Sequence, residues 1–73
     1  MKVAIITVST AAARGEREDV SGRELATLAA SAGGEVVAHE VIADDQLQIE
    51  QALRRHSDPV SEVAVILTTG GTG

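Results

Sequence analysis

The sequence predicts an α/β fold of three layers (αβα, Rossmann-like), in which a parallel β-sheet lies between two layers of helices. Three short segments, at 3–8, 35–42 and 63–67, have the β-branched and apolar composition of strands. The two segments between them carry apolar residues at helical spacing and have helix start and stop signals. The resulting order, β-α-β-α-β, has connections of the length that right-handed parallel crossovers need.

The first predicted strand, Val3–Val8, has the composition of a central strand in a parallel sheet. After Ser9 the stretch Thr10–Val20 becomes small and then charged, which predicts a long loop at the carboxyl end of that strand. Long loops in compact domains often carry function, so we expect this one to line or cover a site.

The first predicted helix starts at Ser21, because Ser21-Gly22-Arg23-Glu24 has the form of a capping box. Gly33-Gly34 predicts its end. The apolar stripe of this helix consists of Leu25, Leu28, Ala29 and Ala32. The segment Glu35–Ile42 alternates in part between apolar and polar residues, which predicts an edge or half-exposed strand that includes His39.

The second predicted helix follows Asp45, which is the expected N-cap, with Gln48 three residues later. Its apolar stripe continues to His56, which suits the negative end of the helix dipole. The helix should end at Ser57-Asp58-Pro59, because proline forces the residue before it out of the α region.

The third predicted strand, Val63–Leu67, is apolar without alternation, which indicates burial on both faces. It leads directly into the glycine-rich segment Thr68–Gly73. Consecutive glycines allow positive φ angles and close approach of a ligand to the backbone, so this segment predicts an anion-binding loop. A flexible tail is the simpler alternative. Because the chain ends on this loop, we interpret residues 1–73 as the N-terminal part of a single larger domain.

The turns at Ser9, Asp44 and Gly70 should emerge at one edge of the sheet, where α/β proteins bind ligands. A carboxylate beside an anion-binding loop would repel the anion unless Mg²⁺ lay between them, which suggests metal-assisted transfer at phosphorus. Arg14 and Arg17 are the cations that could reach this edge, although both also suit a solvated loop. Asp44 is equally suited to be an ordinary residue at a helix start.

Composition excludes several other classes of function. The chain has no Phe, Tyr or Trp and a net charge of -5, which disfavours nucleic-acid binding. It has no Cys, which fits a reducing compartment such as the cytoplasm. Its longest apolar run is far shorter than a membrane span, so no membrane association is expected.

The motifs resemble those of the molybdenum-cofactor biosynthesis proteins of the MogA/MoaB type. The resemblance covers the whole chain and rests on Val8-Ser9, Asp19-Val20-Ser21-Gly22, Ile42-Ala43-Asp44-Asp45 and, above all, Leu67 to Gly73. It implies a cytoplasmic homotrimer that binds molybdopterin and uses Mg-ATP to adenylylate it, releasing pyrophosphate. It also implies that Asp44 is the catalytic residue and Mg²⁺ ligand. The predicted substrate-binding residues are Ser9, Asp19, Ser21, Gly22, Thr69, Gly70, Gly71, Thr72 and Gly73.

The sequence departs from the family pattern at one position within the chain. Members commonly have Asp after the Ser at the end of the first strand, where this chain has Thr10. The second essential Asp of the family would lie just beyond Gly73. A catalytically silent pterin- or nucleotide-binding module, including competence-damage-type and molybdate-insertion relatives, is therefore the alternative. Thr72 and the turn from Asp19 to Gly22 favour the MogA/MoaB type.

Overall fold

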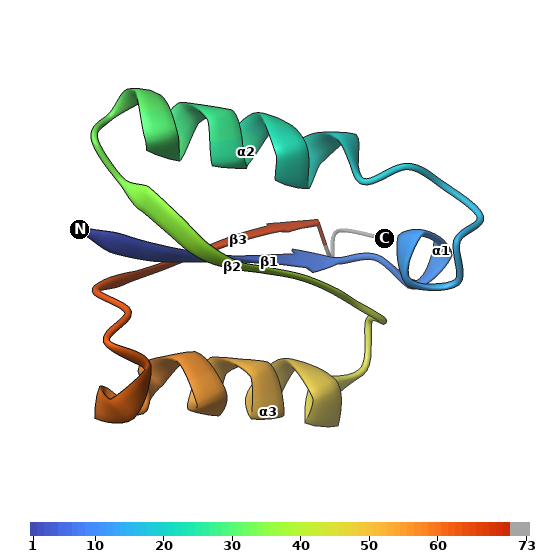
Figure 1. Cartoon of the computed structure of the whole chain (residues 1–73). Helices are drawn as coiled ribbons and strands as arrows, with labels where there is room; N and C mark the ends of the chain where they lie inside the picture. Colours follow the sequence, from blue (N-terminus) through green and yellow to red (C-terminus); the bar gives the residue numbers. More distant parts are fainter. Residues whose placement is uncertain (71–73) are drawn as a thin grey trace.

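The computed structural model describes residues 1–70, and its three strands and its helices form the expected three layers. Helix α2 covers one face of the sheet and α3 the other (Figure 1). The elements in order are β1 (Lys2–Val8), α1 (Thr10–Ala13), α2 (Val20–Ser31), β2 (Glu35–Ile42), α3 (Gln46–Ser57), the 3₁₀ turn η1 (Pro59–Ser61) and β3 (Val65–Gly70). The predicted α/β class is thereby confirmed.

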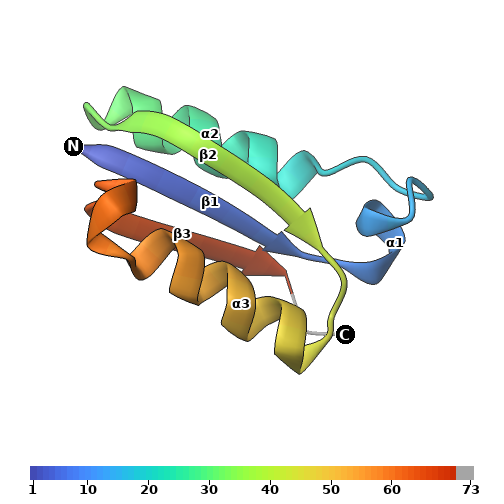
Figure 2. The same ribbon diagram turned by 60° about the horizontal axis from the view of Figure 1, so that its bottom comes forward.

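Strand β1 is the centre of a parallel sheet with the order β2-β1-β3. In the register of the sheet, Val8 at the end of β1 lies opposite Ile42 of β2 and Gly70 of β3. The carboxyl ends of all three strands therefore meet at one edge of the sheet, as Figure 2 shows.

The core is built on both faces of β1, because successive side chains of a strand point to opposite faces. On the α2 side, Val3 and Ile5 contact Ala29. On the α3 side, Ile6 and Val8 contact Ala52. The prediction of a central first strand is confirmed. Among residues 1–70, no helix is both long and apolar enough to cross a membrane.

The predicted loop after β1 begins instead with one helical turn, α1. Ser9 is its N-cap, and the Ser9 side chain accepts a hydrogen bond from the Ala12 amide. The alanines at 11–13 were included in the predicted loop because the stretch becomes small and then charged, but alanine has the highest intrinsic helix propensity.

Helix α2 also differs from the prediction, because its N-cap is Asp19 and not Ser21. Ser21 is exposed in the first helical turn. The predicted stripe is shifted as well: Leu25 and Ala29 pack on the sheet, whereas Leu28 is 66% exposed. The helix start is set by contacts of Asp19 with two strands, which a local capping pattern does not reveal.

The third strand starts and ends later than predicted, at Val65 and Gly70. Its apolar residues are only half-buried, because β3 lies at an edge of the described sheet and not at its centre. Strand β2 alternates in exposure along its whole length, as expected for an edge strand. Asp45 is the N-cap of α3, also as predicted. His56, in the last turn of α3, contacts Glu40 of β2.

Candidate functional site

A cavity of about 510 Å³ opens at the edge of the sheet where the strands end. Its walls come from the end of β1, from α1, from the segment that leads into α2 and the first turn of that helix, from the turn after β2, and from the last residue of β3. The lining residues are Thr7, Val8, Ser9, Thr10, Ala11, Ala12, Arg17, Glu18, Asp19, Val20, Ser21, Asp44 and Gly70.

This cavity brings together five of the predicted site residues, namely Ser9, Asp19, Ser21, Asp44 and Gly70. Two others do not line it: Gly22 is buried in the first turn of α2, and Thr69 is half-buried within β3. Gly71, Thr72 and Gly73 lie outside the described residues. Of the two arginines considered, Arg17 lines the cavity and Arg14 does not.

The turns after β1 and β2 are joined by a hydrogen bond. The Asp44 amide donates to Oγ1 of Thr10 at 3.0 Å. Ser9 sits directly before Thr10, and its amide donates to the Ile42 carbonyl at 2.8 Å. Thr10, which stands where the resembled family commonly has Asp, therefore fixes the backbone that carries Asp44. Sequence reasoning assigned no role to Thr10.

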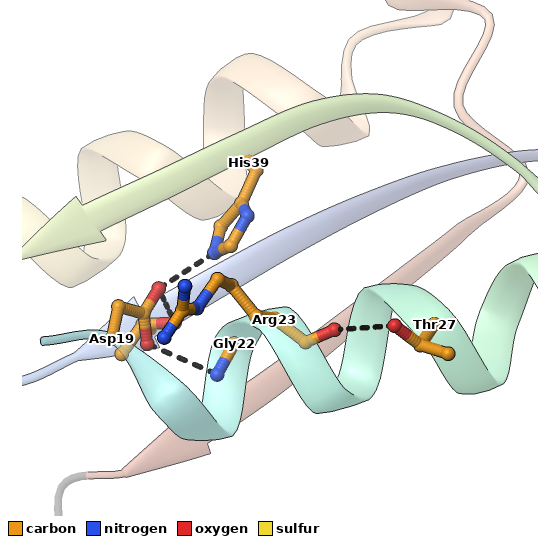
Figure 3. A network of polar contacts seen from close by, with 6 residues as sticks. Asp19, Gly22, Arg23, Thr27 and His39 are labelled. Atoms are coloured by element: carbon orange, nitrogen blue, oxygen red, sulfur yellow. Dashed lines mark hydrogen bonds and ion pairs between the residues drawn. The ribbon is translucent and has the colours of Figure 1, made fainter.

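Asp19 is the most constrained charged residue of the cavity wall. Its Oδ1 accepts from the Gly22 amide at 3.0 Å, and its Oδ2 accepts from the Thr7 hydroxyl at 3.0 Å. Nε2 of His39 lies 2.7 Å from the same Oδ2 (Figure 3). The Asp19 side chain is only 14% exposed. These contacts connect α2 to both β1 and β2.

The pKa of Asp19 is lowered below its ordinary value of 3.8. Burial alone would raise this pKa, but hydrogen bonds from the Gly22 amide, Thr7 and His39, together with the charge of His39, outweigh it. Sequence reasoning missed both Thr7 and His39. Thr7 carried a usable signal, because it is the polar residue of a strand otherwise made of Val, Ala and Ile, and a buried hydroxyl needs a partner.

Gly22 is required by this cluster. A Cβ at position 22 would overlap Oδ2 of Asp19, Oγ1 of Thr7 and Nε2 of His39. Its buried position also explains why it contributes no surface to the cavity. Within the described residues, Gly22 therefore acts in packing, and its predicted contact with substrate stays a prediction.

Gly70 ends β3 with a φ of +88°, in the region that favours glycine. A Cβ at this position would overlap the carbonyl oxygen of Val8. The close approach of these two strand ends explains why glycine stands at this position in the lining of the cavity.

The charged residues around the cavity fall into two groups. Glu18 pairs with Arg23 at 3.2 Å, and Asp19 pairs with His39. Asp44 and Arg17 form no ion pair with any residue of 1–70. One carboxylate and one guanidinium are thus free to contact a ligand.

A magnesium site would depend on Asp44. Residues 1–70 hold no group of three or more acidic or histidine side chains that could enclose a metal ion. Mg²⁺, however, is often held by one or two carboxylates together with substrate phosphates. Asp44 is exposed and fits that role, whereas the oxygens of Asp19 are already occupied by protein donors.

Comparison with known proteins gives consistent matches. Residues 4–73 match the family model described as "Probable molybdopterin binding domain". The chain is 42% identical over 76 residues to the molybdopterin adenylyltransferase of Pyrococcus furiosus, covering 99% of this chain and 41% of that protein. It is 39% identical over 71 residues to molybdenum cofactor biosynthesis protein B of Bacillus cereus, covering 94% and 39% respectively.

A solved structure agrees with these relatives. The crystal structure of the molybdopterin biosynthesis enzyme MoaB from Thermus thermophilus superposes with a TM-score of 0.88 at 38% identity, covering 99% of this chain and 45% of that one. The chain spans about two fifths of the length of the curated relatives it matches.

Proposed function

Since this chain belongs to the family of probable molybdopterin-binding domains, we propose that it is the N-terminal part of a single molybdopterin-binding domain that acts as a molybdopterin adenylyltransferase. The proposed reaction transfers AMP from Mg-ATP to molybdopterin and releases pyrophosphate. The observation that carries the proposal is the cavity in which Asp44, Ser9 and Gly70 meet at the ends of three parallel strands. Identity of 42% to a molybdopterin adenylyltransferase supports it.

Molybdopterin would bind at the glycine-rich segment. Backbone amides from Gly70 to Gly73 and the hydroxyl of Thr72 would hold it, with Thr69 at the start of the segment. The hydroxyls of Ser9 and Ser21, which also line the cavity, would add contacts. The conformation of Gly70 supports this arrangement, because its close approach to Val8 leaves backbone and no side chain at this part of the cavity wall.

ATP would enter the same cavity with its phosphates near Asp44. In the reaction an oxygen of molybdopterin forms a bond to the α-phosphorus, and the bond to the bridging oxygen breaks, so that pyrophosphate leaves with the electron pair. Asp44 would hold Mg²⁺, which neutralises charge on the phosphates when bound. The guanidinium of Arg17, which lines the same cavity, would contact phosphate oxygens.

Asp44→Asn in the full-length protein tests this role. The substitution removes the charge and nearly keeps the shape. We expect adenylylation to fall about a hundredfold or more, comparable to the loss of one preorganised electrostatic contact. Molybdopterin affinity should persist, because that substrate is held by the glycine-rich segment.

Asp45→Asn is the matched control, because it removes a neighbouring charge while Asn still caps α3. Its turnover should stay near that of the unsubstituted protein. Near-normal turnover of Asp44→Asn, or loss of its molybdopterin affinity in step with turnover, would contradict the metal role. An unsubstituted protein that binds molybdopterin without adenylylating it would instead support the silent binding module.

We further propose that the protein is a cytoplasmic homotrimer.

A further inference from the structure

The Asp19 carboxylate is held by donors from three separate elements. The Gly22 amide belongs to α2, Thr7 to β1 and His39 to β2. An ionised carboxylate only accepts hydrogen bonds, so Nε2 of His39 must carry a proton to bond to Oδ2 at 2.7 Å. Figure 3 shows the imidazole reaching down from β2 to the start of the helix.

His39 does not line the cavity, but it contacts Asp19, which does. Asp19, Val20 and Ser21 line the cavity in sequence, and Asp19 is also the N-cap of α2. The position of this wall relative to the sheet therefore depends on what holds Asp19. Thr7 is a fixed residue of the central strand, whereas His39 attaches the same oxygen to the edge strand β2.

We propose that His39 is a positioning residue of the candidate site: by holding Asp19, it fixes the start of α2 and thereby the cavity wall that faces the substrate. The proposal takes the identity of the substrate from the proposed function, while the contact itself is independent of it. Asp19 is then a fixed part of the wall and not a free metal ligand, because protein donors use its oxygens.

The test compares three substitutions in the full-length protein. His39→Ala removes the donor, and His39→Gln keeps an N–H donor near the position of Nε2 without an ionisable ring. Val37→Ala is the matched control, because Val37 is an exposed residue of β2 near His39 in sequence and does not line the cavity.

Three quantities are measured: the pKa of the Asp19 carboxyl by NMR titration, the hydrogen exchange of the Gly22 amide, and kcat/KM for molybdopterin. In His39→Ala we expect a raised Asp19 pKa, exchange at Gly22 faster by about tenfold, and kcat/KM lower by about tenfold through a misplaced wall. His39→Gln should restore exchange and kcat/KM to within about twofold of the original. Val37→Ala should change none of the three.

The outcomes separate this proposal from the proposed function. An unchanged Asp19 pKa and unchanged Gly22 exchange in His39→Ala would overturn the positioning role. So would a normal kcat/KM in a variant whose Asp19 has been released. If the unsubstituted protein does not adenylylate molybdopterin, the proposed function fails, and the NMR measurements alone decide whether His39 holds Asp19. If His39→Ala does not fold, His39→Leu provides the second variant, since it keeps a side chain of substantial volume but removes the donor to Oδ2, and it should raise the same pKa and speed the same exchange.

Discussion

At the scale of single residues, two glycines allow close contacts at the site that any larger side chain would block. Gly22 allows the Asp19 carboxylate to meet Thr7 and His39, and Gly70 allows two strand ends to meet. The polar groups involved are fully used: among residues 1–70, no buried side-chain nitrogen or oxygen lacks a hydrogen-bond partner. In the proposed function, substrate recognition would therefore fall to exposed groups of the cavity such as Asp44 and Arg17, which form no ion pair within residues 1–70.

The lowered pKa of Asp19 predicts an acid-sensitive contribution to stability. Folding favours the ionised carboxylate, so the stabilisation is present above the ordinary value of 3.8 and is lost as pH falls through the lower pKa of the folded state. Unfolding by urea at pH values between about 6 and about 3 measures it. We expect the full-length protein to lose more stability over this range than its Asp19→Asn variant, in which Asn still caps α2.

Glu40 also has a lowered pKa and serves as an internal reference in that experiment. Burial would raise its pKa, but hydrogen bonds from His56 and Arg55 outweigh this and lower it. Because Glu40 contributes equally to both proteins, the difference between them isolates Asp19. If the free energy of unfolding changed with pH in the same way in the two proteins, the acid-sensitive contribution would not come from Asp19.

At the scale of elements, the sequence predicted the strands and helices better than the contacts between them. The strand at Val3–Val8 could be predicted because a run rich in β-branched residues indicates a strand from its composition alone, without knowledge of the strands it pairs with. The predicted start of α2 was wrong because hydrogen bonds from Thr7 and His39 hold Asp19 at the N-cap position. These two residues lie 12 and 20 positions away in the sequence. The exposure of β3 depends on its place in the strand order, which composition does not encode.

Helix α3 is held closely against the sheet by a small residue. Ala52 is fully buried between Ile6 and Val8. We predict that Ala52→Leu lowers the free energy of unfolding of the full-length protein by about 1 to 3 kcal/mol, because the added atoms force α3 away from β1. Gln51→Leu places the same side chain at the exposed neighbouring position and should change stability by less than about 0.5 kcal/mol. Equal effects of the two in urea unfolding would show that α3 is loosely packed.

At the scale of the whole molecule, the parallel sheet explains how the site could be anticipated. Once three parallel strands are predicted, their carboxyl ends must meet at one edge of the sheet. The sequence alone was therefore enough to place Ser9, Asp44 and Gly70 together. Which of the two arginines lines the cavity, Arg14 or Arg17, could not be predicted, because a charged loop residue has no periodic pattern that fixes its direction. The same holds for the bond between Thr10 and the Asp44 amide, which joins residues 34 positions apart.

The proposed trimer is a prediction at this scale too. We expect sedimentation equilibrium of the full-length protein at micromolar concentration to give the mass of three chains. A monomer under those conditions would refute this assembly, and it would leave the proposed chemistry to be judged by the Asp44 variant alone.

The central place of β1 also has a consequence during synthesis. Val3 pairs with Val65, so the two strands are about sixty residues apart in the chain. At translation rates of roughly 5–20 residues per second, β1 leaves the ribosome about 3 to 12 s before its partner β3. For that interval β1, the most apolar strand of the described chain, lacks its β3 partner and has an unpaired edge even after β2 has emerged, and such edges promote aggregation. Nascent chains of this protein should therefore need protection at their first eight residues until β3 has emerged.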